Sequence, residues 1–279
     1  MKSLIHQVCS KFYNNLNQIF TTVNHDPEFI FEDKEVEIVP TWFGRLVLPS
    51  TDEVITPYIK RFGYWDLEVQ TALQRLIRPG MTFWDVGASF GYFSAMVGLT
   101  IPGSIVKAFE PFPPACKLIH ANLKLNGVSA SIVEGALTDS LVRSVHLSTQ
   151  KQNFGDQVVT PTSNTNSIEV PAFRARDFLK SGGIPSVIKI DVQGHELRVI
   201  KGFGSLIFKI PNIILECGPC FTSNELHKTM DELSTYQRLG FNLIFLEEDR
   251  WIPMTIGSII ERLRSGGRET QGNLLLRRR

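Results

Sequence analysis

The chain has 279 residues, of which 43% are apolar and 20% charged, enough for one sizeable α/β domain with additions and incompatible with a largely disordered protein. The formal net charge of +1 supplies no positive field for non-specific nucleic-acid binding. No stretch approaches the roughly 20 apolar residues of a membrane-spanning helix. We therefore expect a cytoplasmic protein without a nucleic-acid partner or a membrane span, of undetermined oligomeric state.

Residues 1–64 are predicted to be an N-terminal extension with a helix and a hairpin. A mildly amphipathic segment comes first, and two short runs of alternating polarity, 35–39 and 44–48, are typical of paired strands. The main domain would then occupy residues 65–279. It begins with a predicted helix over 65–77, which Arg78-Pro79-Gly80 ends.

Two strand–helix units follow this first helix. An apolar run over 81–86 leads into the glycine-containing turn 87–91 and then into a helix that starts at residue 92. A second apolar run, 104–109, ends on Glu110 and Pro111 and precedes a helix over 115–125. Because a helix separates the two strands, we expect them to pair in parallel.

The alternation continues to the end of the chain. After a strand at 130–133 comes a polar, strand-like stretch, 143–173, which contains the loop 150–167. Later elements are strands at 186–191 and 212–216, a helix near 196–200 between them, a helix at 224–239, a strand at 241–246 and an apolar segment at 273–276. This order predicts an α/β Rossmann-like sheet, mostly parallel with an antiparallel strand near its end, with helices on both faces.

Ligands of such sheets bind beyond the carboxyl ends of the strands. The 87–91 turn lets the backbone approach a ligand, and Glu110 could accept both hydroxyls of a ribose. Only one glycine pair is present, in contrast to the G-x-G-x-x-G triple of dinucleotide sites. Asp85 would repel a pyrophosphate but could interact with the ammonium group of a sulfonium ligand. The sequence thus favours S-adenosylmethionine over a dinucleotide.

Four ordered motifs resemble the FkbM family of class I methyltransferases: 83–92 (FWDVGASFGY), 108–111 (AFEP), the helix end 122–126 and 188–196 (IKIDVQGHE). The resemblance covers roughly residues 65–220. It implies an S-adenosylmethionine site made by Asp85, Gly87, Gly91 and Glu110, with adenine near 134–137. The neighbouring residues that it adds to this cofactor site are Ala88, Ser89, Tyr92, Pro111, Glu134 and Ala136. The chain departs from the family pattern at Ser89, where Asn is common, and at Gln193, where Glu is common.

The resemblance also implies methyl transfer to a hydroxyl oxygen, on a sugar, a glycoconjugate or a related small molecule. A hydroxyl acceptor must lose its proton, for which a placed base is needed. The candidate catalytic residues are Asp191, His195 and Glu196. Asp191 and Glu216 could instead share a divalent cation such as magnesium, or could simply line a polar pocket. The sequence does not require a metal.

Other interpretations stay open at this point. Cys217-Gly-Pro-Cys220 matches a thiol–disulfide oxidoreductase motif, although the charge of Glu216 before it opposes thiolate formation. A non-catalytic binding protein could keep the same fold. Methylation of a protein nitrogen is the alternative reaction within this fold.

Overall fold

The computed structural model describes residues 36–148, 157–160, 167–179, 183–218, 223–248, 250–265 and 271–278. The amphipathic segment predicted near the N-terminus, most of the loop 150–167 and Cys220 lie outside these ranges. None of the helices in the described part of the chain combines the length and the apolar character that crossing a bilayer requires.

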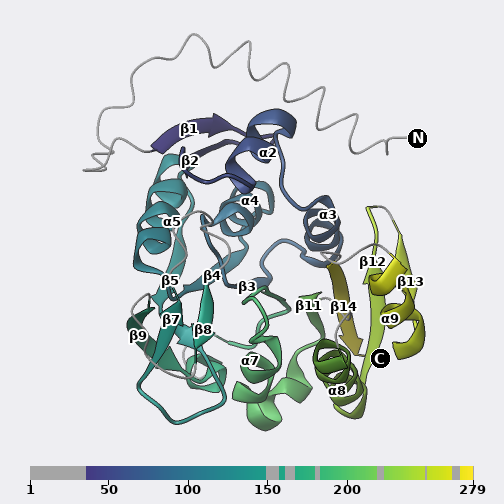
Figure 1. Ribbon diagram of the computed structural model, residues 1–279. Coiled ribbons are helices and arrows are strands. Elements are labelled where there is room, and N and C mark those ends of the chain that lie inside the picture. The colour runs from purple at the N-terminus through teal and green to yellow at the C-terminus, as the bar shows by residue number, and fades with distance from the viewer. Residues whose placement is uncertain are drawn as a thin grey trace.

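An eight-stranded sheet forms the centre of the molecule (Figure 1). Its strands, in spatial order, are β13 (Trp251–Pro253), β12 (Phe241–Leu246), β14 (Gly272–Arg278), β11 (Asn212–Cys217), β10 (Val187–Ile190), β3 (Thr82–Val86), β4 (Ile105–Glu110) and β5 (Ala130–Glu134). The five strands from β11 to β5 are parallel, and β14 runs antiparallel to both β11 and β12. The predicted mostly parallel sheet with a late antiparallel strand is confirmed.

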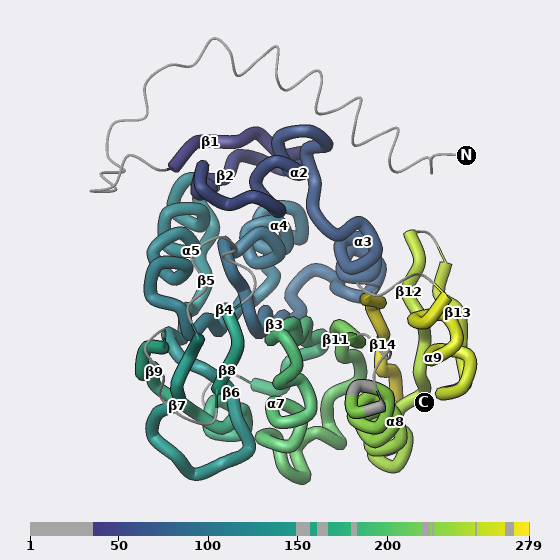
Figure 2. Tube along the Cα trace, in the orientation of Figure 1, coloured from purple at the N-terminus to yellow at the C-terminus, as the bar shows by residue number. Residues whose placement is uncertain are grey.

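Helices cover both faces of the sheet, as predicted (Figures 1 and 2). One face carries α3 (Leu67–Leu76), α4 (Tyr92–Thr100) and α5 (Pro113–Leu125), and the other carries α7 (Glu196–Gly202), α8 (Ser223–Arg238) and α9 (Ile256–Ser265). Because successive residues of a strand point to opposite faces, Phe83 packs in the first core and its neighbour Trp84 in the second. Helix α9 and strand β13 were not expected from the sequence.

The predicted N-terminal hairpin exists as β1 (Val36–Pro40) and β2 (Arg45–Pro49), followed by α2 (Ile55–Phe62). Two asparagines at the end of α5, one in its last turn and one capping it, hold the hairpin. Asn122 accepts a hydrogen bond from Val47 N at 2.5 Å and donates to Val47 O at 3.1 Å, and Asn126 makes the same pair of contacts with Arg45. These side chains therefore join the hairpin to the main domain, in addition to their place at the helix end.

A smaller sheet flanks the main one. Its strands, in spatial order, are β6 (Ala136–Leu137), β9 (Ser167–Phe173), β7 (Ser144–Ser148) and β8 (Val158–Thr160). The last three lie in the polar, strand-like stretch predicted at 143–173. Short 3₁₀ helices at Ala175–Phe178 and Gly204–Lys209 complete the described elements.

The strand order reverses between β3 and β10. From β3 the chain adds β4 and then β5 on one side, whereas β10 and β11 are added on the other. A crevice is expected at such a reversal, beyond the carboxyl ends of the strands.

Candidate functional site

A cavity of about 690 Å³ lies at this reversal. Predicted site residues that line it are Gly87, Ala88, Ser89, Tyr92, Glu110, Pro111, Ala136, Asp191, His195 and Glu216. Four others do not border it: Asp85, Gly91, Glu134 and Glu196. The volume lies within the range typical of small-molecule and cofactor sites.

The loop after β3 is shaped by left-handed backbone. Gly87, Ser89 and Gly91 have φ of +74°, +50° and +75°. A Cβ built on Gly87 would lie 1.8 Å from the carbonyl oxygen of Asp191, so any side chain there would collide with the main chain after β10. Glycine at position 87 thus lets the ends of β3 and β10 approach each other beside the cavity.

Glu110 stands at the end of β4 with its carboxylate facing this loop. One oxygen accepts the Ser89 N–H at 2.8 Å and the other accepts the Phe112 N–H at 2.9 Å. Burial raises the pKa of Glu110 to about 7, against the opposing effect of these two hydrogen bonds. The carboxylate is therefore fixed in place and titrates near neutral pH.

Asp85 lies beneath the loop and is completely buried. Its Oδ2 accepts a hydrogen bond from Ser94 Oγ at 2.7 Å, and its Oδ1 lies 3.7 Å from Lys189 Nζ. Burial raises the pKa of Asp85, although Lys189 and Ser94 oppose the shift. The structure thus places this acid below the cavity wall, in contact with a buried lysine.

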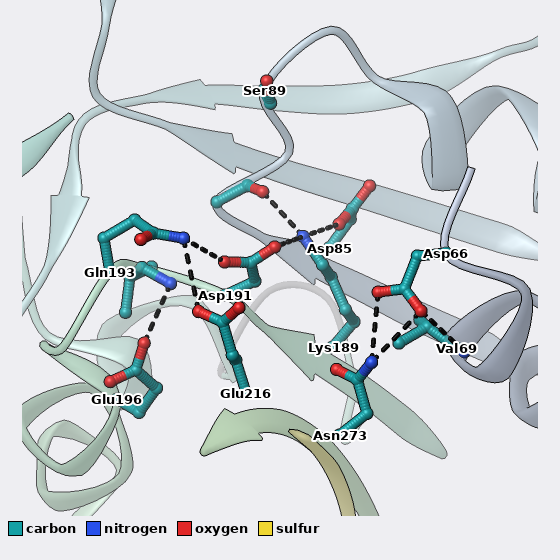
Figure 3. A network of polar contacts seen from close by, with 12 residues as sticks. Asp66, Val69, Asp85, Ser89, Lys189, Asp191, Gln193, Glu196, Glu216 and Asn273 are labelled. Carbon is teal, nitrogen blue, oxygen red and sulfur yellow. Dashed lines mark hydrogen bonds and ion pairs between the residues drawn. The ribbon is translucent and has the colours of Figure 1, made fainter. Parts of the chain in front are cut away.

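Lys189 is the residue around which the polar network is organised (Figure 3). Only 4% exposed, it pairs in register with Asp85 across β10 and β3, and its Nζ donates to Gly87 O at 2.8 Å. Its ion pair with Asp191 Oδ2 is 3.3 Å long. Burial acts to lower the pKa of Lys189, but the carboxylates of Asp191 and Asp85 outweigh it and the pKa is raised.

The network continues to β11 through Gln193. Gln193 Nε2 donates to Asp191 Oδ1 at 3.0 Å and lies 3.3 Å from Glu216 Oε2 (Figure 3). An amide donor therefore stands between the two acids that could have shared a cation. Burial, together with the neighbouring Asp191, raises the pKa of Glu216 to about 8. In the described part of the chain, no group of three or more His, Cys, Asp or Glu side chains is arranged to hold a metal ion.

Glu196 begins α7 and holds the loop that precedes it. Its Oε1 accepts the N–H groups of Val192 at 3.2 Å and Gly194 at 3.0 Å. Burial raises its pKa despite these hydrogen bonds. The visible role of the side chain is to fix the turn in which Gln193 and Gly194 have positive φ, next to Asp191.

His195 lines the cavity from the same turn. Burial lowers its pKa to about 4, with Arg198 adding to the shift, so the imidazole is neutral at pH 7. Its Nε2 is buried and makes no hydrogen bond within the described residues. A neutral imidazole with an unused ring nitrogen can accept or donate one hydrogen bond to a ligand.

The wall predicted to receive adenine is apolar. Gly135, Ala136 and Leu137 line the cavity, joined by Leu147 and Val159 of the small sheet. The Glu134 side chain is 59% exposed and faces His120, whose Nε2 lies 3.4 Å from it. Backbone and apolar side chains, with no carboxylate from position 134, therefore form this wall.

Two charged residues of the cavity were missed from the sequence. Lys189 had a signal, a charged residue inside the apolar run 186–191, whereas Asp66 resembles an ordinary helix-capping acid. Asp66 does cap α3 by accepting Val69 N–H at 3.2 Å, but it also accepts Asn273 Nδ2 at 3.1 Å. Burial raises its pKa to about 7, with Glu68 adding to the shift.

Cys217 stands at the end of β11, where it is buried, and it lines neither this cavity nor the smaller pocket beside it. Its partner in the redox motif lies outside the described residues. The geometry around Cys217 therefore adds nothing to the thiol–disulfide interpretation.

The family described as "Methyltransferase FkbM domain" matches residues 85–243 of the chain. One relative is "31-O-demethyl-FK506 methyltransferase FkbM" of Streptomyces tacrolimicus, 29% identical over 45% of this chain and 60% of the relative. Another is "Hexuronic acid methyltransferase AglP" of Haloferax volcanii, 24% identical over 53% of this chain and 61% of the relative. The chain thus spans less than two thirds of either relative.

Among solved structures, a SAM-dependent O-methyltransferase from Thermotoga maritima is 16% identical. The match covers 89% of this chain and 80% of that one, with a TM-score of 0.43.

Proposed function

Because the chain belongs to the FkbM methyltransferase family, we propose that it transfers a methyl group from S-adenosylmethionine to a hydroxyl oxygen of a carbohydrate or related small molecule. The observation that carries the proposal is one cavity bordered by the Gly87 loop, by Glu110 and by Asp191. The names of the two relatives support parts of this proposal: one names an O-demethyl compound, which fits methyl transfer to oxygen, and the other names a hexuronic acid, which fits a sugar-type substrate.

The cavity has groups that suit this cofactor. An ionised carboxylate can accept about four hydrogen bonds, and each oxygen of Glu110 has one from the backbone, so each can accept a ribose hydroxyl as well. Ser89 borders the cavity, and its Oγ is buried without a hydrogen bond to any described residue. The apolar wall at Ala136 and Leu137 suits a flat base.

When bound, S-adenosylmethionine supplies a methyl group on a positively charged sulfur. The protein has to position the acceptor hydroxyl and take up its proton; good positioning alone can contribute about 7–11 kcal/mol. Asp191 is the proposed proton acceptor, because it lines the cavity while Lys189 and Gln193 fix its two oxygens. His195 is the second candidate, since the residue borders the same space and its Nε2 makes no hydrogen bond within the described residues.

The donor site is tested by calorimetric titration with S-adenosylmethionine and with its demethylated product. Glu110→Gln should weaken both by at least about tenfold, because a neutral amide loses charge-assisted acceptance from the ribose hydroxyls. Glu261→Gln, the same change on the exposed face of α9, should leave both affinities unaltered. Failure of the wild-type protein to bind either compound would overturn the proposed function.

Affinity for the cofactor should also depend on pH. The carboxylate of Glu110 must be ionised to accept both hydroxyls, and its pKa is about 7 in the free protein. As the pH falls below 7, protonation competes with binding, and affinity should drop by up to about tenfold per pH unit. Titrations from pH 5.5 to 8.5 measure this slope. A slope that Glu110→Gln leaves unchanged would assign the titration to another group.

A further inference from the structure

A second pocket, of about 220 Å³, adjoins the acceptor end of the main cavity. Gln193, Glu216 and Gln271 border both spaces, so a molecule held near Asp191 could extend a substituent past Glu216 into this side pocket. The proposed methyl transfer makes no use of the side pocket.

Three carboxylates border the side pocket, each from a different element: Glu216 of β11, Glu196 of α7 and Glu232 of α8. Lys228 is the cation among its described lining residues, and Lys228 Nζ already donates to Gly194 O at 2.9 Å. Burial raises the pKa of Glu232 to about 7, with Lys228 opposing and Glu196 adding to the shift. The pocket is therefore rich in acceptors and negative when ionised.

Two buried residues of its lining each have a polar oxygen without a hydrogen-bond partner among the described residues. Thr229 is 6% exposed, and its hydroxyl makes no hydrogen bond to any described residue. Glu196 is 4% exposed; Oε1 accepts both backbone N–H groups, and Oε2 has no hydrogen bond within the described residues. Buried polar groups are normally paired in proteins, so unpaired ones that border a pocket indicate that a ligand satisfies them.

We propose that the side pocket binds a protonated amino group of the acceptor, so that the substrate class is an amine-bearing hydroxyl compound such as an amino sugar. An ammonium group offers three donors and no acceptor, which matches the oxygens of Glu216, Glu232 and Thr229. A uronate would instead bring an acceptor-only carboxylate to a pocket lined by acceptors, and each of these acids that is ionised would repel it. This inference rests on the proposed function.

Binding of an amine should release protons. Glu216 faces Asp191, Glu196, Asp66 and Lys189, and burial with the neighbouring acids holds its pKa at about 8, so it is mostly protonated at pH 7. A cation favours the ionised carboxylate, so Glu216 must give up its proton when the amine binds. Glu232, which faces Lys228, Glu196 and Lys201, contributes a further fraction.

The test is calorimetry on the full chain with D-glucosamine, D-glucose and D-glucuronate, with and without the demethylated cofactor. At pH 7 glucosamine should bind at least about tenfold more tightly than glucose, as expected of a charge-assisted hydrogen bond, and glucuronate should bind more weakly than glucose. Titrations repeated in two buffers of different ionisation enthalpy should show proton release when glucosamine binds and none when glucose or glucuronate binds.

Glu232→Gln should bring the affinities for glucosamine and glucose to within about threefold, leaving glucose binding unchanged, since Glu232 borders only the side pocket. Asp231→Asn, at the adjacent exposed position of α8, should keep the preference. Equal binding of the three sugars, a preference for glucuronate, or no glucosamine binding would overturn the inference. A lack of cofactor binding would defeat the proposed function instead, and the charge preference measured without cofactor would still decide this inference.

Discussion

Asp191→Asn is expected to lower kcat of methyl transfer by about 10²- to 10⁴-fold, which is the usual contribution of a placed general base. Asparagine keeps the size of the side chain and can still accept from Gln193 Nε2, which lies 3.0 Å away, but it cannot take up a proton. Because Asp191 lies at the end of β10 and Glu110 at the end of β4, the cofactor Kd should stay within about threefold. Steady-state kinetics and calorimetry on the same preparation measure both quantities.

His195→Ala separates the two candidate bases. His195 has a pKa of about 4, so the imidazole is already neutral above pH 5. Titration of His195 therefore cannot change the activity between pH 5 and 8. If histidine were the base, His195→Ala would lose turnover while Asp191→Asn kept it. Full turnover by both variants would remove the proposed role from both residues. If Asp191→Asn weakened cofactor binding by as large a factor as it lowered kcat, Asp191 would have a structural role instead of a catalytic one.

Lys189→Met is expected to destabilise the fold by about 3–5 kcal/mol, because removing one partner of a buried ion pair leaves the other charge uncompensated. Asp85 is fully buried 3.7 Å from Lys189 Nζ, and Gly87 O would also lose its donor. At about 2–4 °C per kcal/mol, the midpoint of thermal unfolding should fall by roughly 6–20 °C. Thermal and urea unfolding followed by circular dichroism measure the change.

Two further variants show whether the loss comes from the uncompensated charge. The double change Lys189→Met with Asp85→Asn should recover part of the stability, since the buried carboxylate is then absent. Lys107→Met, at a neighbouring position on β4 where Nζ lies over the rings of Trp84 and Phe178, should cost no more than about 1 kcal/mol. If Lys189→Met were no worse than Lys107→Met, the buried pair would not be holding the loop.

Much of the fold could be predicted because the parallel strands are short apolar runs separated by helices. The runs at 81–86, 104–109 and 186–191 became β3, β4 and β10, and the turn at Gly87 lies at their carboxyl ends. Helix α9 was missed although its apolar residues Ile256, Ile259, Ile260 and Leu263 recur at helical spacing and pack in the second core. Local pattern alone did not show that β14 would insert between β11 and β12.

Predictions for individual side chains were less complete, because a motif gives the order of residues along the chain and does not show where each side chain points. Asp85 and Glu110 both lie within the last two residues of an apolar parallel strand. Yet Glu110 faces the cavity, while Asp85 is turned down onto Ser94 and Lys189. Glu134 was grouped with the adenine wall and instead faces solvent beside His120. Asp66, distant in sequence, reaches the cavity from the start of α3.

The sequence by itself determined the strand order along the chain, the glycine turn and the acid at the end of β4, because backbone propensity and hydrophobic spacing are local properties. Only the tertiary structure decided which buried charged side chains pair with one another. Lys189 contacts Asp85, Asp191 and Gly87 because the ends of β3 and β10 meet at the sheet reversal, where a low dielectric forces buried charges into pairs. The side pocket of Glu196, Glu216 and Glu232 exists for the same reason: three separate elements converge there, and no stretch of sequence contains all three.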